Sequence, residues 1–226
     1  MQKQFIYPII FALLAALSAC IGDDIIDDRV DEQIRILSNV DTIGFGEEFQ
    51  FEASFFNNVG AETETLIEWS SSDEVIITID QTGLAKAISA GAANIYATVD
   101  LMEKSIRDTI PVVVGENTVV SIESRSGTIK ASSFYTLEGS FTMTEEDGTV
   151  TIAFADDYVA SEALPGLYIY LTNNPNTVGG ALEIGAVDVF KGEHNYKIEE
   201  LDINEYNHLL YWCKPFGVKV GDGDIE

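Results

Sequence analysis

Apolar and polar side chains alternate over much of the chain with the period of a β-strand. Between residues 48 and 55 the odd positions are apolar and the even positions are polar, the apolar ones being Phe49, Phe51, Ala53 and Phe55. This alternation places the apolar side chains on one face of a half-buried strand. Apolar runs continue at short spacing, at residues 75–79, 84–88, 95–99 and 106–114. Many short strands separated by Gly, Asn, Asp and Ser predict an all-β sandwich or barrel.

The second half of the chain predicts another all-β domain, an antiparallel sandwich or barrel at residues 118–226. Residues 149–154 and 167–171 are apolar runs rich in β-branched and aromatic residues. The first of these runs follows residues 146–148, Glu-Asp-Gly, which have the composition of a hairpin tip. Residues 115–117 are a polar, glycine-containing break before this half, so we place the domain boundary there.

The first 20 residues have the pattern of a lipoprotein signal. Lys3 precedes an apolar stretch at residues 5–17, which is too short to span a membrane. Two small residues then precede Cys20, and this ending resembles the lipobox of bacterial lipoproteins. The resemblance implies that residues 1–19 are removed as a signal peptide and that Cys20 is acylated. It predicts an exported protein that is anchored to a membrane through its lipid.

Residues 20–32 are expected to form an acidic tether. Six of the residues between 21 and 32 are carboxylates: Asp23, Asp24, Asp27, Asp28, Asp31 and Glu32. Such a run cannot bury enough apolar surface to fold alone, so we expect a solvated spacer. It also resembles the acidic export tag of lipoproteins that some Gram-negative bacteria display. That resemblance implies attachment to the outer membrane with exposure at the cell surface.

The charge balance excludes one class of partner. The chain carries 12 Lys and Arg against 38 Asp and Glu, a net charge of −26. Loss of Lys3 with the signal would leave 11 against 38, or −27. We exclude a nucleic-acid partner because phosphates need cationic side chains. A basic patch on anionic lipid is excluded for the same reason, whereas a protein or glycan partner stays open.

Three segments of the first half resemble the bacterial immunoglobulin-like domains of group 2. They are residues 69–75 (Trp-Ser-Ser-Ser-Asp-Glu-Val), 79–85 (Ile-Asp-Gln-Thr-Gly-Leu-Ala) and 91–95 (Gly-Ala-Ala-Asn-Ile). The resemblance implies an immunoglobulin-like β-sandwich at residues 33–115. A large ring such as that of Trp69 suits the space between two sheets. The family implies a spacer or adhesive module without chemistry of its own.

The second half resembles the DM-thirteen domain along nearly its whole length. The matching segments, in order, are residues 125–127, 138–140, 164–171, 184–185, 192–196 and 210–218. The last one, Leu-Tyr-Trp-Cys-Lys-Pro-Phe-Gly-Val, is the most specific. The resemblance implies electron transfer centred on Cys213. One departure is Tyr135, where family members often carry a histidine.

Cys213 is the candidate for redox chemistry, with Tyr211, Trp212, Lys214 and His194 as candidate neighbours. If Cys20 is acylated, Cys213 is the last thiol in the chain and no internal disulfide can form. A redox role would therefore need an outside protein, a metal or a cofactor. The alternative is that Cys213 is a small hydrophobic residue on a strand that is covered on both faces.

The chain does not carry the spacing of a metal or catalytic site. A blue-copper centre needs one Cys, two His and a weak axial ligand such as Met. His208 and Cys213 are five residues apart, which places them on opposite faces of a continuous strand. The acidic residues 221–226 lack the spacing of a calcium loop, and we expect a frayed tail there. We assign no catalytic residue, no metal ligand and no cofactor.

These patterns favour a binding or structural module over an enzyme. We expect a cell-envelope lipoprotein in which an immunoglobulin-like spacer presents the second all-β domain to a protein or glycan. The alternative is a redox module that uses Cys213 with an external partner or cofactor. The sequence leaves open the ligand, the oligomeric state and the face of the envelope.

Overall fold

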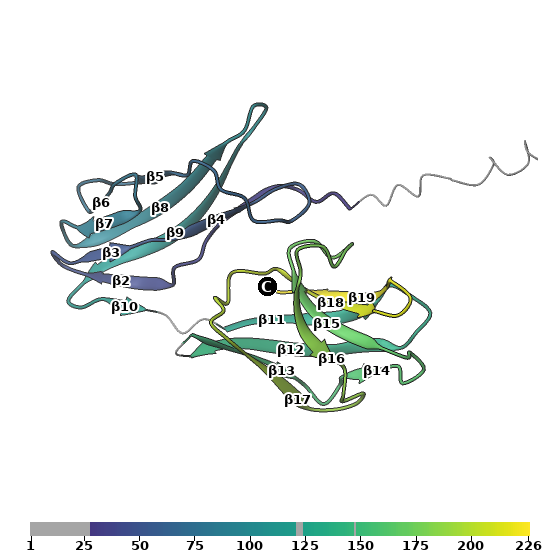
Figure 1. The fold of residues 1–226 in the computed structure, drawn as a ribbon. Helices are drawn as coiled ribbons and strands as arrows, with labels where there is room; N and C mark the ends of the chain where they lie inside the picture. The colour runs from purple at the N-terminus through teal and green to yellow at the C-terminus, as the bar shows by residue number, and fades with distance from the viewer. Residues whose placement is uncertain (1–27, 121–123, 147) are drawn as a thin grey trace, which may run out of the picture.

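The computed structural model describes residues 28–120, 124–146 and 148–226, and all of its regular elements are β-strands (Figure 1). The prediction of an all-β protein is confirmed. The signal peptide, Cys20 and most of the acidic tether lie outside the described residues. Within the described ranges no helix is long and apolar enough to cross a membrane.

The first unit is a sandwich of short strands. They are β1 (Gln33–Ile36), β2 (Val40–Gly44), β3 (Glu48–Gln50), β4 (Ala53–Phe56), β5 (Glu68–Ser71), β6 (Ile77–Ile79), β7 (Leu84–Ala87), β8 (Gly91–Asp100) and β9 (Ser105–Gly115). One sheet has the order β2-β9-β8-β5, in which β2 and β9 are parallel. The strands β3-β7-β6 and the pair β1-β4 form separate sheets. Apolar side chains from all these sheets form one core, which includes Trp69 and Phe51.

Two details of the first unit differ from the sequence prediction. The alternating segment at residues 48–55 is two strands, because β3 pairs with β7 whereas β4 pairs with β1. The chain changes sheet at Phe51, whose amide donates to the carbonyl of Gly83. The unit also extends past the expected boundary at residue 115, since β10 (Val119–Val120) pairs with β2.

The second unit is one antiparallel sheet of nine strands that curls into a nearly closed barrel. Its strands are β11 (Ser124–Ala131), β12 (Leu137–Glu146), β13 (Thr149–Phe154), β14 (Val159–Ala160), β15 (Leu167–Thr172), β16 (Leu182–Ala186), β17 (His194–Glu199), β18 (His208–Cys213) and β19 (Val218–Asp224). Their order is β16-β15-β18-β19-β11-β12-β13-β17, with β14 paired to β12. The end strands β16 and β17 both line one pocket, so they face each other across an open seam. The predicted hairpin before residue 149 is present, since Glu146 pairs with Thr149.

Arg35 of β1 joins the two units. Its Nη1 donates to the backbone oxygen of Asn204 at 2.6 Å, and its Nη2 donates to Oδ1 of Asn173. Its guanidinium also lies 4.3 Å from the ring centroid of Phe56. Burial lowers the pKa of Arg35 to about 10, and the positive charge of Arg125 adds to this effect. The hydrogen bonds and the ring offset the cost of burying this charge at the junction.

Uncharged amides complete the junction. Nδ2 of Asn207 donates to Oε1 of Gln33 at 2.8 Å, and Nδ2 of Asn204 donates to Oδ1 of Asn39 at 2.7 Å. Gly60 packs directly on the second unit: it has a φ of +75°, and a Cβ there would lie 2.8 Å from the backbone carbonyl of Asn173. Only glycine fits this combination of left-handed backbone and close approach.

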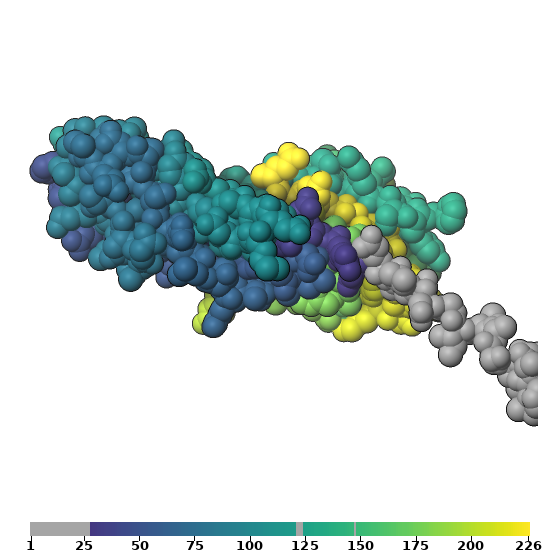
Figure 2. All heavy atoms as spheres, turned by 90° about the horizontal axis from the view of Figure 1, so that it is seen from above, coloured from purple at the N-terminus to yellow at the C-terminus, as the bar shows by residue number. Residues whose placement is uncertain are grey.

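The described end of the acidic tether, residues 28–32, packs against both units. The backbone oxygen of Asp28 accepts a hydrogen bond from Asn174 of the second unit. The amide of Val30 donates to Asn58, and Glu32 pairs with Lys104 at 2.7 Å. Figure 2 shows the first described residues, in purple, against the second unit, in green and yellow. Residues 28–32 are therefore not the solvated spacer expected from the sequence, because hydrogen bonds and an ion pair hold them against both units.

Candidate functional site

Cys213 lies in the interior of the barrel. Its side chain is 0% exposed, and it belongs to the apolar core of the second unit together with Leu209 and Tyr211. Its neighbours in the sheet are Leu167 on β15 and Val218 on β19. A thiol in this place behaves as a small hydrophobic residue and offers no surface to an external redox partner.

Lys214 and Trp212 are directed away from Cys213. The Nζ of Lys214 contacts the carboxylate of Glu183 at 2.8 Å and lies 4.5 Å from the ring centroid of Tyr168. Trp212 is half-buried on the face of β18 opposite Cys213. Among the described residues, no hydrogen bond, ion pair or ring contact joins Cys213 to Lys214 or His194. The structure thus does not bring the predicted redox neighbours together around the sulfur.

His194 and Tyr211 instead belong to an aromatic cluster with Tyr158. The ring centroid of Tyr158 lies 4.5 Å from that of His194 and 6.4 Å from that of Tyr211. Nδ1 of His194 donates to the oxygen of Gly192 at 2.9 Å, and Nε2 is the other ring nitrogen. Among the described residues, this Nε2 and the hydroxyls of Tyr158 and Tyr211 are buried without a hydrogen bond of ordinary geometry.

Burial changes the acidity of both phenols. It raises the pKa of Tyr158 to about 12 and that of Tyr211 well above its ordinary value, and each phenol also influences the other. Both side chains therefore stay neutral at physiological pH. Sequence reasoning named His194 and Tyr211 but missed Tyr158, since no local pattern links position 158 to either of them. In the part of the chain that the structure describes, no group of three His, Cys, Asp or Glu side chains could hold a metal ion.

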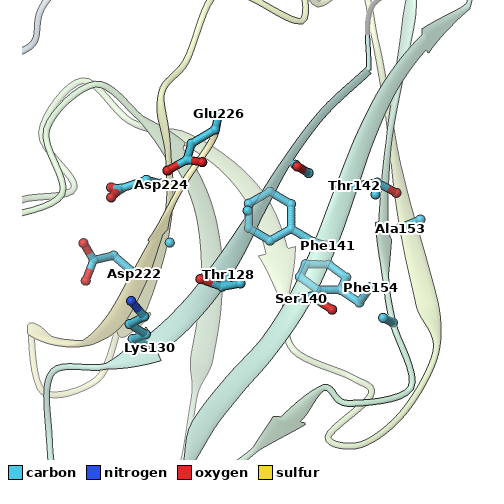
Figure 3. A pocket seen from close by; sticks show the side chains of 14 residues that line it. Thr128, Lys130, Ser140, Phe141, Thr142, Ala153, Phe154, Asp222, Asp224 and Glu226 are labelled. Atoms are coloured by element: carbon cyan, nitrogen blue, oxygen red, sulfur yellow. The ribbon is translucent and has the colours of Figure 1, made fainter.

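A groove on the second unit crosses β19, β11, β12 and β13, and it is here named the β11 groove (Figure 3). It has a volume of about 610 Å³. Its lining residues are mostly small or polar: Ser126, Gly127, Thr128, Lys130, Ser140, Phe141, Thr142, Ala153, Phe154, Ala155, Asp222, Gly223, Asp224 and Glu226. A volume in this range is typical of small-molecule sites.

Hydroxyls line the middle of the groove. Ser126 and Thr128 on β11 and Thr142 on β12 are exposed on the outer face of the barrel. Ser140 is oriented by Asp157, whose carboxylate accepts from its hydroxyl at 3.0 Å and from its amide at 2.9 Å. Alternation along each strand sends Ile129 and Phe141 into the core, which leaves the polar residues between them on the outside.

Carboxylates form one side of the groove. Figure 3 shows Asp222, Asp224 and Glu226 together at this side, with Lys130 close to Asp222. Asp222 pairs with Lys219 at 3.1 Å, and Asp224 accepts from Nδ1 of His208 at 2.9 Å. Burial lowers the pKa of His208 although Asp224 opposes this effect, so His208 is mostly neutral at pH 7. The side as a whole is therefore negative and rich in hydrogen-bond acceptors.

Gly127 allows the carboxylate side to approach the hydroxyls. A Cβ at this position would lie 2.0 Å from the backbone oxygen of Asp224 and 2.6 Å from Cζ of Phe141. The amides of Ser126 and Glu226 bond to each other's carbonyls at 2.9 Å and 2.8 Å. The prediction of a frayed acidic tail at residues 221–226 is therefore wrong. Most of this segment is β19, and the two residues after it are hydrogen-bonded as well.

The family match falls in the first unit. Residues 33–110 match the family described as bacterial Ig-like domain (group 2). The first unit is a bacterial Ig-like domain. This confirms the resemblance read from the sequence, and the match covers about a third of the chain.

One curated relative shares part of the chain. It is the polysaccharide lyase 8 family protein HylA of Enterococcus faecalis, which is 54% identical over 56 residues. The match covers 24% of this chain and 4% of that protein. The chain thus spans only a small fraction of the relative's length.

The residues that identify the Ig-like domain serve its fold. Trp69 is 7% exposed in the core, where its ring centroid lies 6.1 Å from that of Phe51. One carboxylate oxygen of Asp80 accepts from the amides of Thr82 and Leu84. Hydrogen bonds from Thr82 and Leu84 lower the pKa of Asp80. These residues build a hairpin and a core, so the β11 groove of the second unit is the better candidate for a binding site.

Proposed function

We propose that the protein is a cell-envelope lipoprotein, anchored through Cys20, that binds a carbohydrate chain in the β11 groove. The second unit, a DM-thirteen-like barrel, is the binding part, and the Ig-like domain is the spacer that presents it. Anchoring and location rest on the signal-like first 20 residues.

The composition of the β11 groove carries this proposal. Sugar hydroxyls both donate and accept hydrogen bonds, and the groove offers matching groups on both sides. Three carboxylates accept, Lys130 donates, and the hydroxyls of Ser126, Thr128 and Thr142 do both. The partial match to a polysaccharide lyase family protein supports a carbohydrate-associated role for this chain. The redox alternative has no comparable support, because Cys213 is sealed in the core.

The charge of the groove limits the sugars that fit. Asp222, Asp224 and Glu226 repel a polymer rich in carboxylates or sulfates, as does the net charge of −26. We therefore expect neutral or amino sugars to bind and acidic polysaccharides to bind weakly. A neutral probe such as a dextran oligosaccharide and a cationic one such as a chitosan oligosaccharide test both classes.

Variants of exposed threonines test the groove without disturbing the core. Thr142→Val removes one groove hydroxyl at nearly constant volume, and the affinity for the binding oligosaccharide should fall about fivefold in calorimetric titration. The matched control is Thr144→Val on the same strand, which is exposed outside the groove and should bind as the native chain does. Equal affinity of all three proteins, or no binding of either probe, would contradict the proposal.

A further inference from the structure

Exposed apolar side chains divide into two groups by their surroundings. Among the described residues, six large apolar side chains are more than 60% exposed: Phe45, Leu66, Val75, Met102, Phe134 and Phe216. Four of them, all in the Ig-like domain, have an Asp or Glu within two positions in the sequence. Phe134 and Phe216 do not, and both belong to the second unit. Phe134 and Phe216 therefore differ from the other four in having no acidic residue next to them in the sequence.

The connections that carry Phe134 and Phe216 lie at the same end of the barrel, next to the pairing of Ala131 on β11 with Gly221 on β19. Phe134 is in the loop that connects β11 and β12, and Phe216 is in the turn between β18 and β19. The two connections meet at Val220, whose oxygen accepts from the amide of Ser132 and from the hydroxyl of Ser133. We call residues 132–136 and 214–218 the distal tip.

The distal tip faces away from the Ig-like domain. The junction between the units uses Asn173 and Asn207, which lie where β15 ends and where β18 begins. The tip lies at the opposite ends of these strands, beyond Leu167 and Cys213. Among the described residues, no hydrogen bond, ion pair or ring contact joins the tip to the Ig-like domain.

The tip has a fixed backbone beneath its exposed side chains. The amide of Phe216 donates to the oxygen of Cys213 at 3.2 Å, and the amide of Lys214 donates to Gly166 at 3.0 Å. Phe134 is 109% exposed and Phe216 is 68% exposed, so both rings project from this frame into solvent. Tyr135 and Val218 are exposed beside them, at 42% and 47%.

The charge of the tip is unusual for this protein. About one residue in six of the chain is Asp or Glu, yet residues 132–136 and 214–218 contain none. Lys214 belongs to the tip and Lys219 follows it, and their partners Glu183 and Asp222 lie outside it. A low-dielectric surface that approaches the tip therefore buries no carboxylate of the tip itself.

We propose that the distal tip inserts Phe134 and Phe216 into the interface of a lipid bilayer with zwitterionic headgroups. Exposed rings on two neighbouring connections suit a fluid interface, which needs no matching groove. Tyr135 and the lysines have an apolar stem and a polar end, as headgroup depth requires. The net charge of −26 opposes anionic lipid, so we assign the zwitterionic surface.

Vesicle co-sedimentation tests this assignment. The protein is residues 20–226 with Cys20→Ser, which keeps every described residue and removes the acylation site. We expect it to bind phosphatidylcholine vesicles and to bind less well when phosphatidylglycerol is added. Each of Phe134→Ser and Phe216→Ser should lower the partition coefficient about tenfold.

The matched control is Met102→Ser, which removes an equally exposed apolar side chain that stands between Asp100 and Glu103. It should bind vesicles as the unsubstituted protein does. The proposal is overturned if phosphatidylcholine vesicles are not bound, or if Met102→Ser reduces binding as much as the tip variants do. Binding that the Phe variants leave unchanged would also overturn it. Each outcome is independent of sugar binding in the β11 groove.

Discussion

The buried hydroxyls of Tyr158 and Tyr211 are the clearest energetic anomaly at the scale of single residues. A buried polar group without a partner costs about 1–3 kcal/mol, whereas its replacement by an apolar group of the same shape can be nearly neutral or stabilising. Of the four side-chain atoms that are buried without a hydrogen bond among the described residues, three belong to Tyr158, Tyr211 and His194. The rings of the cluster therefore fill the barrel core, whereas their unpaired polar atoms lower the free energy of unfolding.

Replacement of both phenols should not weaken the protein. For Tyr158→Phe/Tyr211→Phe we expect a free energy of unfolding at pH 7 that is unchanged or up to about 1 kcal/mol higher in urea titration. The control is Tyr170→Phe, because the hydroxyl of Tyr170 donates to Glu183 at 3.0 Å and its loss should cost about 1 kcal/mol. A clear loss of stability in the double variant would show that the two hydroxyls are satisfied in solution.

The same phenols predict a change in alkaline stability. Since the pKa of Tyr158 is raised to about 12 in the folded state, the unfolded chain, with tyrosine pKa values near 10, ionises first. The free energy of unfolding is therefore unaffected by this ionisation below pH 10, and it falls as the pH rises from 10 toward 12. The double Phe variant should lose less stability over this window. Tyr206, whose pKa is also raised to about 12, should retain part of the effect.

At the scale of elements, the approach of β19 to β11 depends on a missing side chain. Gly127→Ala would place a Cβ 2.0 Å from the backbone oxygen of Asp224, so the backbone of β11 or of β19 must shift. We expect a loss of about 1–3 kcal/mol in the free energy of unfolding, measured with urea. The control is Gly179→Ala, where the nearest atom would lie 3.5 Å away. Equal stability of the two variants would mean that β19 can move away from β11 without cost.

The whole molecule depends on Arg35 to hold its two units together. Arg35→Ala removes two hydrogen bonds to the second unit and the contact with Phe56, about 2 kcal/mol of docking energy. We expect the radius of gyration from X-ray scattering to increase while the β-sheet circular dichroism stays the same. Arg107→Ala is the control, since Arg107 stacks on Tyr96 within the Ig-like domain, 4.7 Å from its ring centroid. A radius of gyration that Arg35→Ala leaves unchanged would show that the amides suffice.

Much of the secondary structure follows from local sequence. Alternation at residues 149–154 and the tip before them identify β13 and its hairpin, because both signals act over a few residues. The segment at residues 48–55 shows the limit, since the same alternation serves two strands in different sheets. Alternation shows which face of a strand is buried. It does not show which strands pair, because the partners lie elsewhere in the chain.

The sequence by itself determined the all-β class, the Ig-like domain in the first half of the chain and a net charge of −26. These properties depend on composition and on patterns of a few residues. Only the tertiary structure decided that β19 lies beside β11, that Cys213 is sealed and that Phe134 and Phe216 share one end of the barrel. The reason is physical: pairing between strands some 90 residues apart reflects the packing of the whole core, which no short segment specifies.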